Sequence, residues 1–151
     1  TGVRPEYRNL VGRFSIPFIL YDPRGELKGE DATTMQQADF LPTLLDLLGL
    51  QREVVSFGHN VFSPSSPHFA VSSAGEMYQM VQGNFVLHFD GVRATGFYDK
   101  SRDPGLKHNL VARQPTQMQE MVRTLKAYLQ EFTHRMTENR LRLSARRSPM
   151  R

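Results

Sequence analysis

The chain has 151 residues, of which 39% are hydrophobic and 23% charged, with a formal net charge of +4. This length allows one domain with one core, and no apolar stretch approaches the roughly 20 residues that a membrane-spanning helix needs. The absence of cysteine excludes disulfides, thiolate catalysis and thiolate metal sites.

The positive charge is concentrated at the C-terminal end. From residue 140 onward there are five arginines and no acidic residue, and removing these five charges from +4 leaves −1 for the rest. Residues 139–151 are therefore predicted to be a solvated, disordered tail, with binding to phosphate-rich partners or lipid headgroups as the alternative. The arginines are Arg140, Arg142, Arg146, Arg147 and Arg151.

The N-terminal third is predicted to supply one strand and one helix to an α/β sheet. Residues 1–13 are mixed and polar, which predicts an irregular lead-in, and residues 14–50 hold the two elements. Within them, Ser15–Tyr21 is apolar on both faces and rich in β-formers, as in a strand covered on both sides. Pro17 lies near its start, where a missing N–H does least harm.

A short helix with both ends marked is predicted from about Ala38 to Leu48. Asp39 can cap its first turn, because a carboxylate accepts hydrogen bonds from free N–H groups and favours the positive end of the helix dipole. Pro42 fits the first turn, and Gly49 suits the left-handed stop. Leucines at three- and four-residue spacing predict one buried apolar face. They are Leu41, Leu44, Leu45 and Leu48.

A connector and an antiparallel meander are predicted next. Residues 51–67 carry no periodic pattern, and at this length they must lie along a surface or be mobile. Residues 68–138 are predicted to form a C-terminal subdomain of a meander plus a helix. Turns that contain Gly75, Gly83 and Gly91 separate its strands, as hairpins with positive φ require. The strand candidates are Phe69–Ser73, Met77–Val81, Phe85–Phe89 and Arg93–Tyr98.

The last predicted element is a helix that starts near Pro115, which suits the first helical position. It is expected to fray after Thr137. Its apolar stripe is rich in methionine, and a core face is favoured over a partner-binding face. The stripe consists of Met118, Met121, Val122, Leu125, Tyr128, Leu129, Phe132 and Met136.

No catalytic, cofactor-binding or metal-binding residue is predicted on this chain. No two histidines stand at the i, i+2 or i, i+4 spacing of a metal site, so each is predicted to be a surface or turn residue. Asp99 and Asp103 flank a turn whose backbone they can bond, and nothing specific supports a catalytic carboxylate pair. The histidines are His59, His68, His88, His108 and His134, and the other notable acids are Asp22, Asp39 and Asp46.

Nucleic acid is not predicted to be a partner. The meander carries aromatic residues that could stack on bases, but its strands carry few lysines or arginines, so the electrostatic part of such binding is missing. The aromatic residues are Tyr78, Phe85, Phe89, Phe97 and Tyr98. The sequence also lacks a nucleophile elbow, a P-loop and a dinucleotide fingerprint.

Three motifs in order resemble the C-terminal part of the sulfatase-like enzymes of the alkaline phosphatase superfamily. They are Ile16–Pro23, Gln37–Gly49 and the run from Tyr98 through Asp103-Pro104 to Asn109-Leu110. The closest resemblance is to the membrane-anchored phosphoglycerol transferases of the lipoteichoic acid synthase type, and it covers roughly Phe14 to Phe132. It implies an alkaline-phosphatase-like α/β fold, of which this chain would hold the C-terminal portion. As a fragment the chain would be α+β, with one strand and helix of the main sheet, a small antiparallel meander and a long C-terminal helix.

The resemblance also implies a function for a longer parent protein. Such enzymes cleave or transfer a sulfate or phosphate ester with a divalent metal, Mn, Mg or Ca, and the parent would sit in a bacterial cell membrane with its catalytic domain outside the cytoplasm. The family's Cys/Ser-x-Pro-x-Arg and Ser-Asp-His-Gly motifs are absent here. This chain, which starts at Thr1 rather than at a methionine, is thus expected to be a soluble, inactive piece that lacks the nucleophile and the metal ligands.

The expected partner of such a piece is the remainder of its own catalytic domain, and open strand edges invite self-association. The alternative is a stand-alone α+β module that docks a protein or an anionic partner through the meander face or the arginine tail. A third reading, a complete small hydrolase, needs a clustered site that the sequence lacks. The gene sequence before Thr1 separates the first two.

Overall fold

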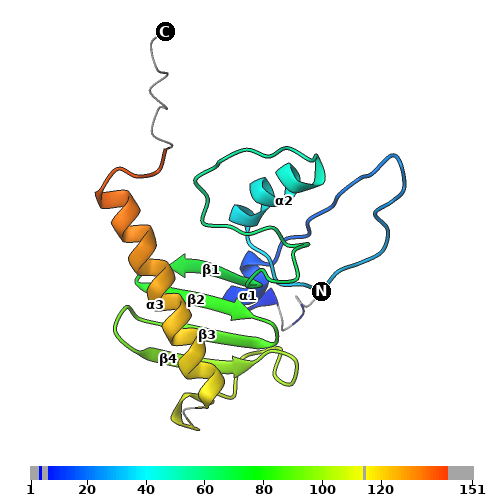
Figure 1. The fold of residues 1–151 in the computed structure, drawn as a ribbon. Coiled ribbons are helices and arrows are strands. Elements are labelled where there is room, and N and C mark those ends of the chain that lie inside the picture. The colour runs from blue at the N-terminus through cyan, green and yellow to red at the C-terminus, as the bar shows by residue number, and fades with distance from the viewer. Residues whose placement is uncertain (1–3, 5–6, 114, 143–151) are drawn as a thin grey trace. The chain divides into compact units, whose positions relative to one another are not determined.

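The computed structural model describes residues 4, 7–113 and 115–142. They form a four-stranded antiparallel sheet and several helices, so the protein belongs to the mixed α+β class (Figure 1). The chain divides into two compact units. The sheet unit comprises Thr1–Thr34 and His68–Val122, and the helical unit comprises Met35–Pro67 and Arg123–Arg151.

The sheet unit contains the predicted meander. Its strands β1 (Phe69–Ala74), β2 (Met77–Gln82), β3 (Phe85–Phe89) and β4 (Ala94–Asp99) pair with their chain neighbours in the order β1-β2-β3-β4. The glycines at the three turns all have positive φ, at 61°, 55° and 95° for Gly75, Gly83 and Gly91. Hairpins of this kind are local structures, so turn chemistry and period two were enough to predict them.

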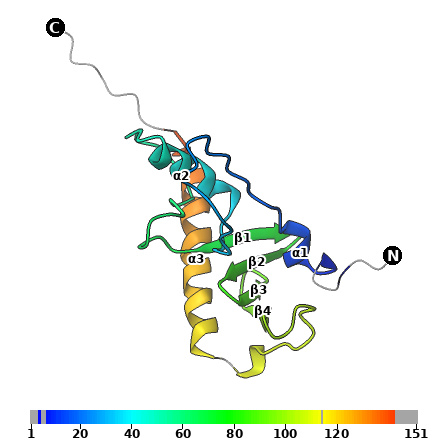
Figure 2. The same ribbon diagram turned by 90° about the vertical axis from the view of Figure 1, so that its right-hand side faces the viewer.

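One face of the sheet carries most of the core. The register places Met80, Leu87 and Phe97 side by side across β2, β3 and β4, and each is at most 1% exposed. The first turns of helix α3 (Thr116–Thr137) lie against this sheet in both views, where Met118 and Met121 are also buried (Figures 1 and 2). The predicted core face of α3 is therefore confirmed for these turns.

The side chain of Asn109 forms hydrogen bonds with the outer edge of β4, as a neighbouring strand would. The Phe97 N–H donates to Oδ1 of Asn109 over 3.0 Å, and Nδ2 of Asn109 donates to the Thr95 carbonyl over 3.0 Å. The Leu110 N–H completes the edge by donating to the Phe97 carbonyl over 2.7 Å. The amide thus satisfies backbone groups that an edge strand would otherwise expose.

The helical unit contains a short 3-10 turn, η2 (Gln37–Asp39), that runs into α2 (Phe40–Leu47). Gly49, with φ of 64°, ends α2, and the Leu50 N–H returns to the Leu45 carbonyl over 2.8 Å. This is the predicted left-handed stop.

Helix α3 ends as predicted at Thr137, and its start is one residue later than predicted, because Pro115 precedes the first helical residue. Asn139 takes the left-handed conformation with φ of 52°, and the Arg140 N–H donates to the Arg135 carbonyl over 2.8 Å. Most of the predicted tail, residues 143–151, lies outside the described residues. No helix among the described residues is long and apolar enough to span a membrane.

Two predictions for the N-terminal region were wrong. The lead-in contains a short helix, α1 (Leu10–Phe14), because Asn9 accepts from the Gly12 N–H and caps its first turn. Ser15–Tyr21 contains no strand in the described structure. A strand needs a ladder of hydrogen bonds to a neighbouring strand, and in the described residues the sheet consists of β1 to β4 alone.

The predicted burial of the leucine face of α2 was also wrong. Leu41 is 44% exposed and Leu48 is 60% exposed, while Thr43 is the buried residue at 1%. At 3.6 residues per turn, Thr43 lies on the side of the helix opposite the leucines. Polar contacts on that opposite side, described below, decide which face of α2 is covered.

Candidate functional site

The five histidines do not converge on one site. His59 and His68 lie in loops, His108 in a turn, His88 on β3 and His134 on α3. Among residues 4, 7–113 and 115–142, no group of three or more histidine, aspartate or glutamate residues could hold a metal ion.

The most organised polar cluster lines one edge of η2 and α2. Oδ1 of Asp39 accepts from the His59 N–H over 2.8 Å, and Oγ1 of Thr43 accepts from the Val61 N–H over 3.1 Å. One turn further, Oδ2 of Asp46 accepts from the Asn60 amide over 2.8 Å. We call Asp39, Thr43 and Asp46 the polar edge. It binds the connector to the helix through the backbone N–H groups of His59 and Val61 and the side-chain amide of Asn60.

Asp39 does not cap α2 as predicted. Its Oδ2 accepts from the Gln36 N–H over 2.8 Å, so the carboxylate reaches backward as the third residue of a capping box. Its other oxygen is committed to His59. With 4% exposure and both oxygens bonded, Asp39 is a structural residue.

The connector lies unusually close to η2 at Gly58. A Cβ built on Gly58 would stand 2.0 Å from the Ala38 carbonyl oxygen and 2.4 Å from the Asp39 nitrogen. Only glycine fits there. The hydroxyl of Ser56 supports the same approach, because it donates to the Ala38 carbonyl over 3.3 Å and accepts from the Gly58 N–H over 2.9 Å.

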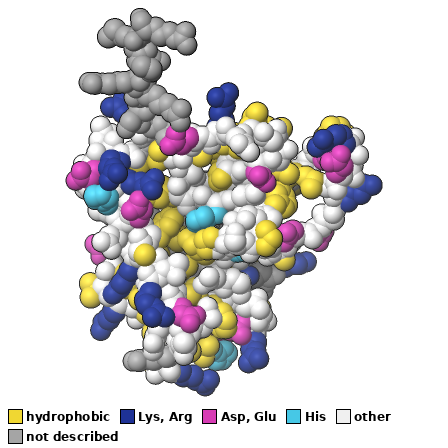
Figure 3. Space-filling view, in the orientation of Figure 1, with side chains coloured by type: hydrophobic (Ala, Val, Ile, Leu, Met, Phe, Trp, Pro, Cys, Tyr) yellow, Lys and Arg dark blue, Asp and Glu magenta, His cyan; other side chains and the backbone are white. Residues whose placement is uncertain are grey.

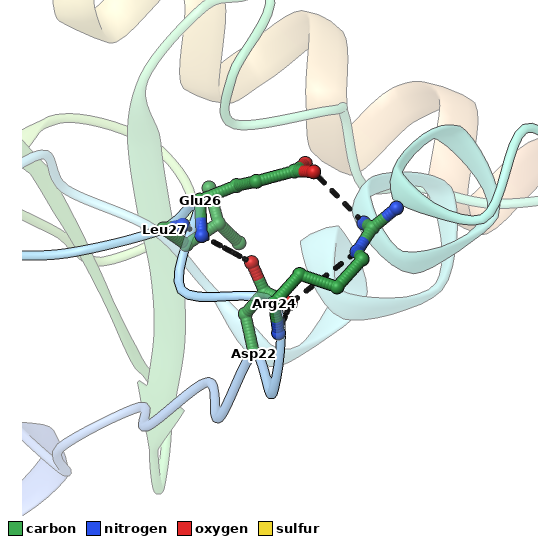
Figure 4. Close-up of polar contacts among 4 residues, drawn as sticks. All are labelled: Asp22, Arg24, Glu26 and Leu27. Atoms are coloured by element: carbon green, nitrogen blue, oxygen red, sulfur yellow. Dashed lines mark hydrogen bonds and ion pairs between the residues drawn. The ribbon is translucent and has the colours of Figure 1, made fainter.

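Asp22 organises the turn that follows the apolar segment (Figure 4). Its carboxylate accepts from the N–H groups of Arg24, Glu26 and Leu27 over 3.0, 2.8 and 3.2 Å. These bonds, led by that from Arg24, hold the pKa of Asp22 below its ordinary value of 3.8. The carboxylate is fully used within its own turn.

This turn should respond to acid. A pKa below 3.8 means that the stabilisation by Asp22 is complete above pH 3.8 and is lost as the pH falls through the lower pKa of the folded turn. We expect the amide resonances of Glu26 and Leu27 to move in that range in an NMR titration. Asp22→Asn should abolish the movement and Asp46→Asn should leave it intact; an unchanged titration in Asp22→Asn would contradict this role.

Asp99 and Asp103 accept hydrogen bonds from the backbone of the turn that follows β4, as predicted. Oδ1 of Asp99 accepts from the Ser101 N–H over 3.0 Å and from its hydroxyl, and Oδ2 of Asp103 accepts from the His108 N–H over 2.6 Å. Both pKa values are lowered, by the Ser101 hydroxyl for Asp99 and by the His108 N–H for Asp103. These carboxylates also have structural roles.

Sequence reasoning missed a polar row across the sheet. Ser72, Gln79 and His88 are in register on β1, β2 and β3, with Nε2 of His88 3.2 Å from Oε1 of Gln79. Burial lowers the pKa of His88. Its ring lies 5.3 Å from the Tyr98 ring, and Tyr98 in turn covers Gly96. The signal was a polar residue at matching positions of successive strands, which is visible only once the register is known.

The remaining candidate is the apolar segment Ser15–Tyr21 itself. Ile16 is 65% exposed, Ile19 83% and Tyr21 89%. Several large apolar side chains exposed to water within one short segment indicate an interaction surface. The candidate functional site is therefore this segment, and it suits docking rather than catalysis.

No protein family model matches this chain, and no curated protein matches it at a significant level. These comparisons therefore assign the chain to no family.

Proposed function

We propose that this chain is the C-terminal part of a sulfatase-like enzyme of the alkaline phosphatase superfamily, of the membrane-anchored phosphoglycerol transferase type. The proposal is supported by what the motif residues do. In the second motif, Asp39 and Thr43 hold the connector. In the third, Asp103 orders a turn and Asn109 closes the edge of β4.

The exposure of Ser15–Tyr21 carries the proposal. Its sequence has the pattern of a strand buried on both faces, yet Ile19 and Tyr21 are more than four-fifths exposed. Full burial of a large aliphatic side chain such as that of Ile19 contributes about 1.5–3 kcal/mol. A main sheet built by residues upstream of Thr1 would supply the missing neighbours and cover both faces.

The parent would cleave or transfer a sulfate or phosphate ester outside the cytoplasm. A divalent metal, Mn, Mg or Ca, would lower the pKa of the nucleophile and neutralise charge on the transferred group. The Cys/Ser-x-Pro-x-Arg and Ser-Asp-His-Gly motifs, which hold the nucleophile and the metal in this family, do not occur in the sequence, so the proposal assigns both to upstream residues. The role of this chain is then to complete the fold around them.

The gene sequence before Thr1 gives the first test. We expect membrane-spanning segments and a Ser-Asp-His-Gly motif in the same reading frame. A start codon close to Thr1, with neither feature upstream, would reject the proposal in favour of the stand-alone interaction module.

An assay of hydrolysis gives the second test. The purified chain is expected to show no turnover of p-nitrophenyl phosphate, p-nitrophenyl sulfate or a phosphatidylglycerol analogue with Mn²⁺, Mg²⁺ or Ca²⁺. The parent polypeptide is expected to turn over at least one of them in a metal-dependent manner. Metal-dependent turnover by the chain alone would contradict our assignment of the active site to upstream residues.

A further inference from the structure

The C-terminal end of α3 presents large apolar side chains to solvent. Phe132 is 42% exposed and Met136 51%, and they lie one turn apart on the same face of the helix. Leu141, just beyond the helix, is 44% exposed. Together with Arg140 and Arg142, we call these residues the α3 end patch. All five belong to the helical unit.

In the sequence, positive charge is concentrated within this patch and after it. Between Glu131 and Arg151 there are six arginines and two glutamates, a net charge of +4 that equals the charge of the whole chain. Arg135 is already committed, because it pairs with Glu131 and lies 5.5 Å above the Phe57 ring. Lysine and arginine side chains are visible at this end of the helix, beside acidic and histidine side chains (Figure 3, upper left).

We propose that the α3 end patch docks the protein onto a bilayer surface rich in anionic phospholipids. Arginines near such a surface are attracted to its negative potential, and exposed apolar side chains enter the boundary between headgroups and acyl chains. The combination of arginines and exposed apolar side chains favours a membrane over a nucleic acid, because contacts with phosphates involve the arginines but not Met136 and Leu141. This inference does not depend on the enzymatic proposal, and the two can fail separately.

Vesicle co-sedimentation of the whole chain tests the proposal. We expect binding to phosphatidylcholine vesicles that contain one third phosphatidylglycerol, weakening as salt is raised, and little binding to pure phosphatidylcholine. The double variant Arg140→Ser/Arg142→Ser should bind roughly 30-fold more weakly. Met136→Ser/Leu141→Ser, which keeps every charge, should also bind more weakly.

The matched control is Arg13→Ser/Arg113→Ser, which removes the same charge at exposed positions of the sheet unit and should bind like the wild type. Circular dichroism checks that each variant is folded. Equal binding to both vesicle types, no binding, or an unchanged affinity of the Arg140/Arg142 or Met136/Leu141 variant would overturn the proposal. Tighter binding to single-stranded RNA than to the anionic vesicles would replace the membrane with nucleic acid.

Discussion

Replacing Phe97 with alanine is expected to reduce the free energy of unfolding of the sheet unit by about 3–5 kcal/mol. Phe97 is 1% exposed, and its ring stacks on that of Phe85 with centroids 5.3 Å apart and planes inclined by 9°. Truncation removes the buried ring and leaves a cavity beside Leu87, its partner in register on β3. Since small domains are stable by about 5–15 kcal/mol, this is a large fraction of the total.

The measurement is urea-induced unfolding followed by circular dichroism. The matched control is Phe14→Ala in α1, where the side chain is 51% exposed and the expected cost is below about 1 kcal/mol. Equal midpoints for the two variants would mean that the stacked ring contributes nothing and that the core lies elsewhere.

Gly58→Ala is expected to detach the connector from η2, at a cost of about 3 kcal/mol or more. The added Cβ would meet backbone atoms, the Ala38 carbonyl oxygen at 2.0 Å and the Asp39 nitrogen at 2.4 Å, which cannot rotate away as a side chain can. The connector would have to move, and the bonds from the His59 and Val61 N–H groups to the polar edge would break with it.

Amide hydrogen exchange locates this effect. We expect His59 and Val61 to lose protection in Gly58→Ala while the amides of β2 and β3 keep theirs, because unfolding can be confined to one part of a structure. Gly105→Ala is the matched control, since its Cβ would meet only Lys107 side-chain atoms, the nearest at 3.4 Å. Retained protection of His59 and Val61 in Gly58→Ala would show that the connector is not held by this close approach.

These two variants also bear on the proposed function. Phe97 lies beside the Asn109 edge, and Gly58 lies against the helix of the second motif. If the motifs exist to build this scaffold, both variants should lower the yield of folded parent enzyme. The ratio of activity to folded protein should then stay unchanged, because neither residue is placed at the site of reaction.

The apolar segment Ser15–Tyr21 shows what the sequence could and could not predict. Its period and composition indicated that Ser15–Tyr21 is built to be buried on both faces. They could not indicate which segments lie beside it, because a strand forms its hydrogen bonds with another segment of the chain and not within itself. Exposure of Ile19 and Tyr21 is the structural finding that turned a predicted strand into a candidate docking site.

The contacts of the polar edge are a second feature that the sequence did not predict. The sequence marked Asp39 as a helix cap, since a carboxylate at that position has local N–H groups within reach. In the structure one carboxylate oxygen accepts from the nearby Gln36 N–H, and the other accepts from the His59 N–H, twenty residues away. Local propensity describes the contacts that a residue can make with its neighbours, whereas a connector folding back onto a helix decides which contacts it makes.

By itself, the sequence determined the antiparallel meander, the left-handed stop at Gly49 and the end of α3 at Thr137, because hairpins and helix ends are set by residues a few positions apart. Only the tertiary structure decided which face of α2 is covered, the polar row of Ser72, Gln79 and His88 across the sheet, and the exposure of Ser15–Tyr21. Each of these features depends on contacts between segments that are far apart in the chain. The hydrophobic pattern of a segment predicts that it is buried, but it does not predict which other segment covers it.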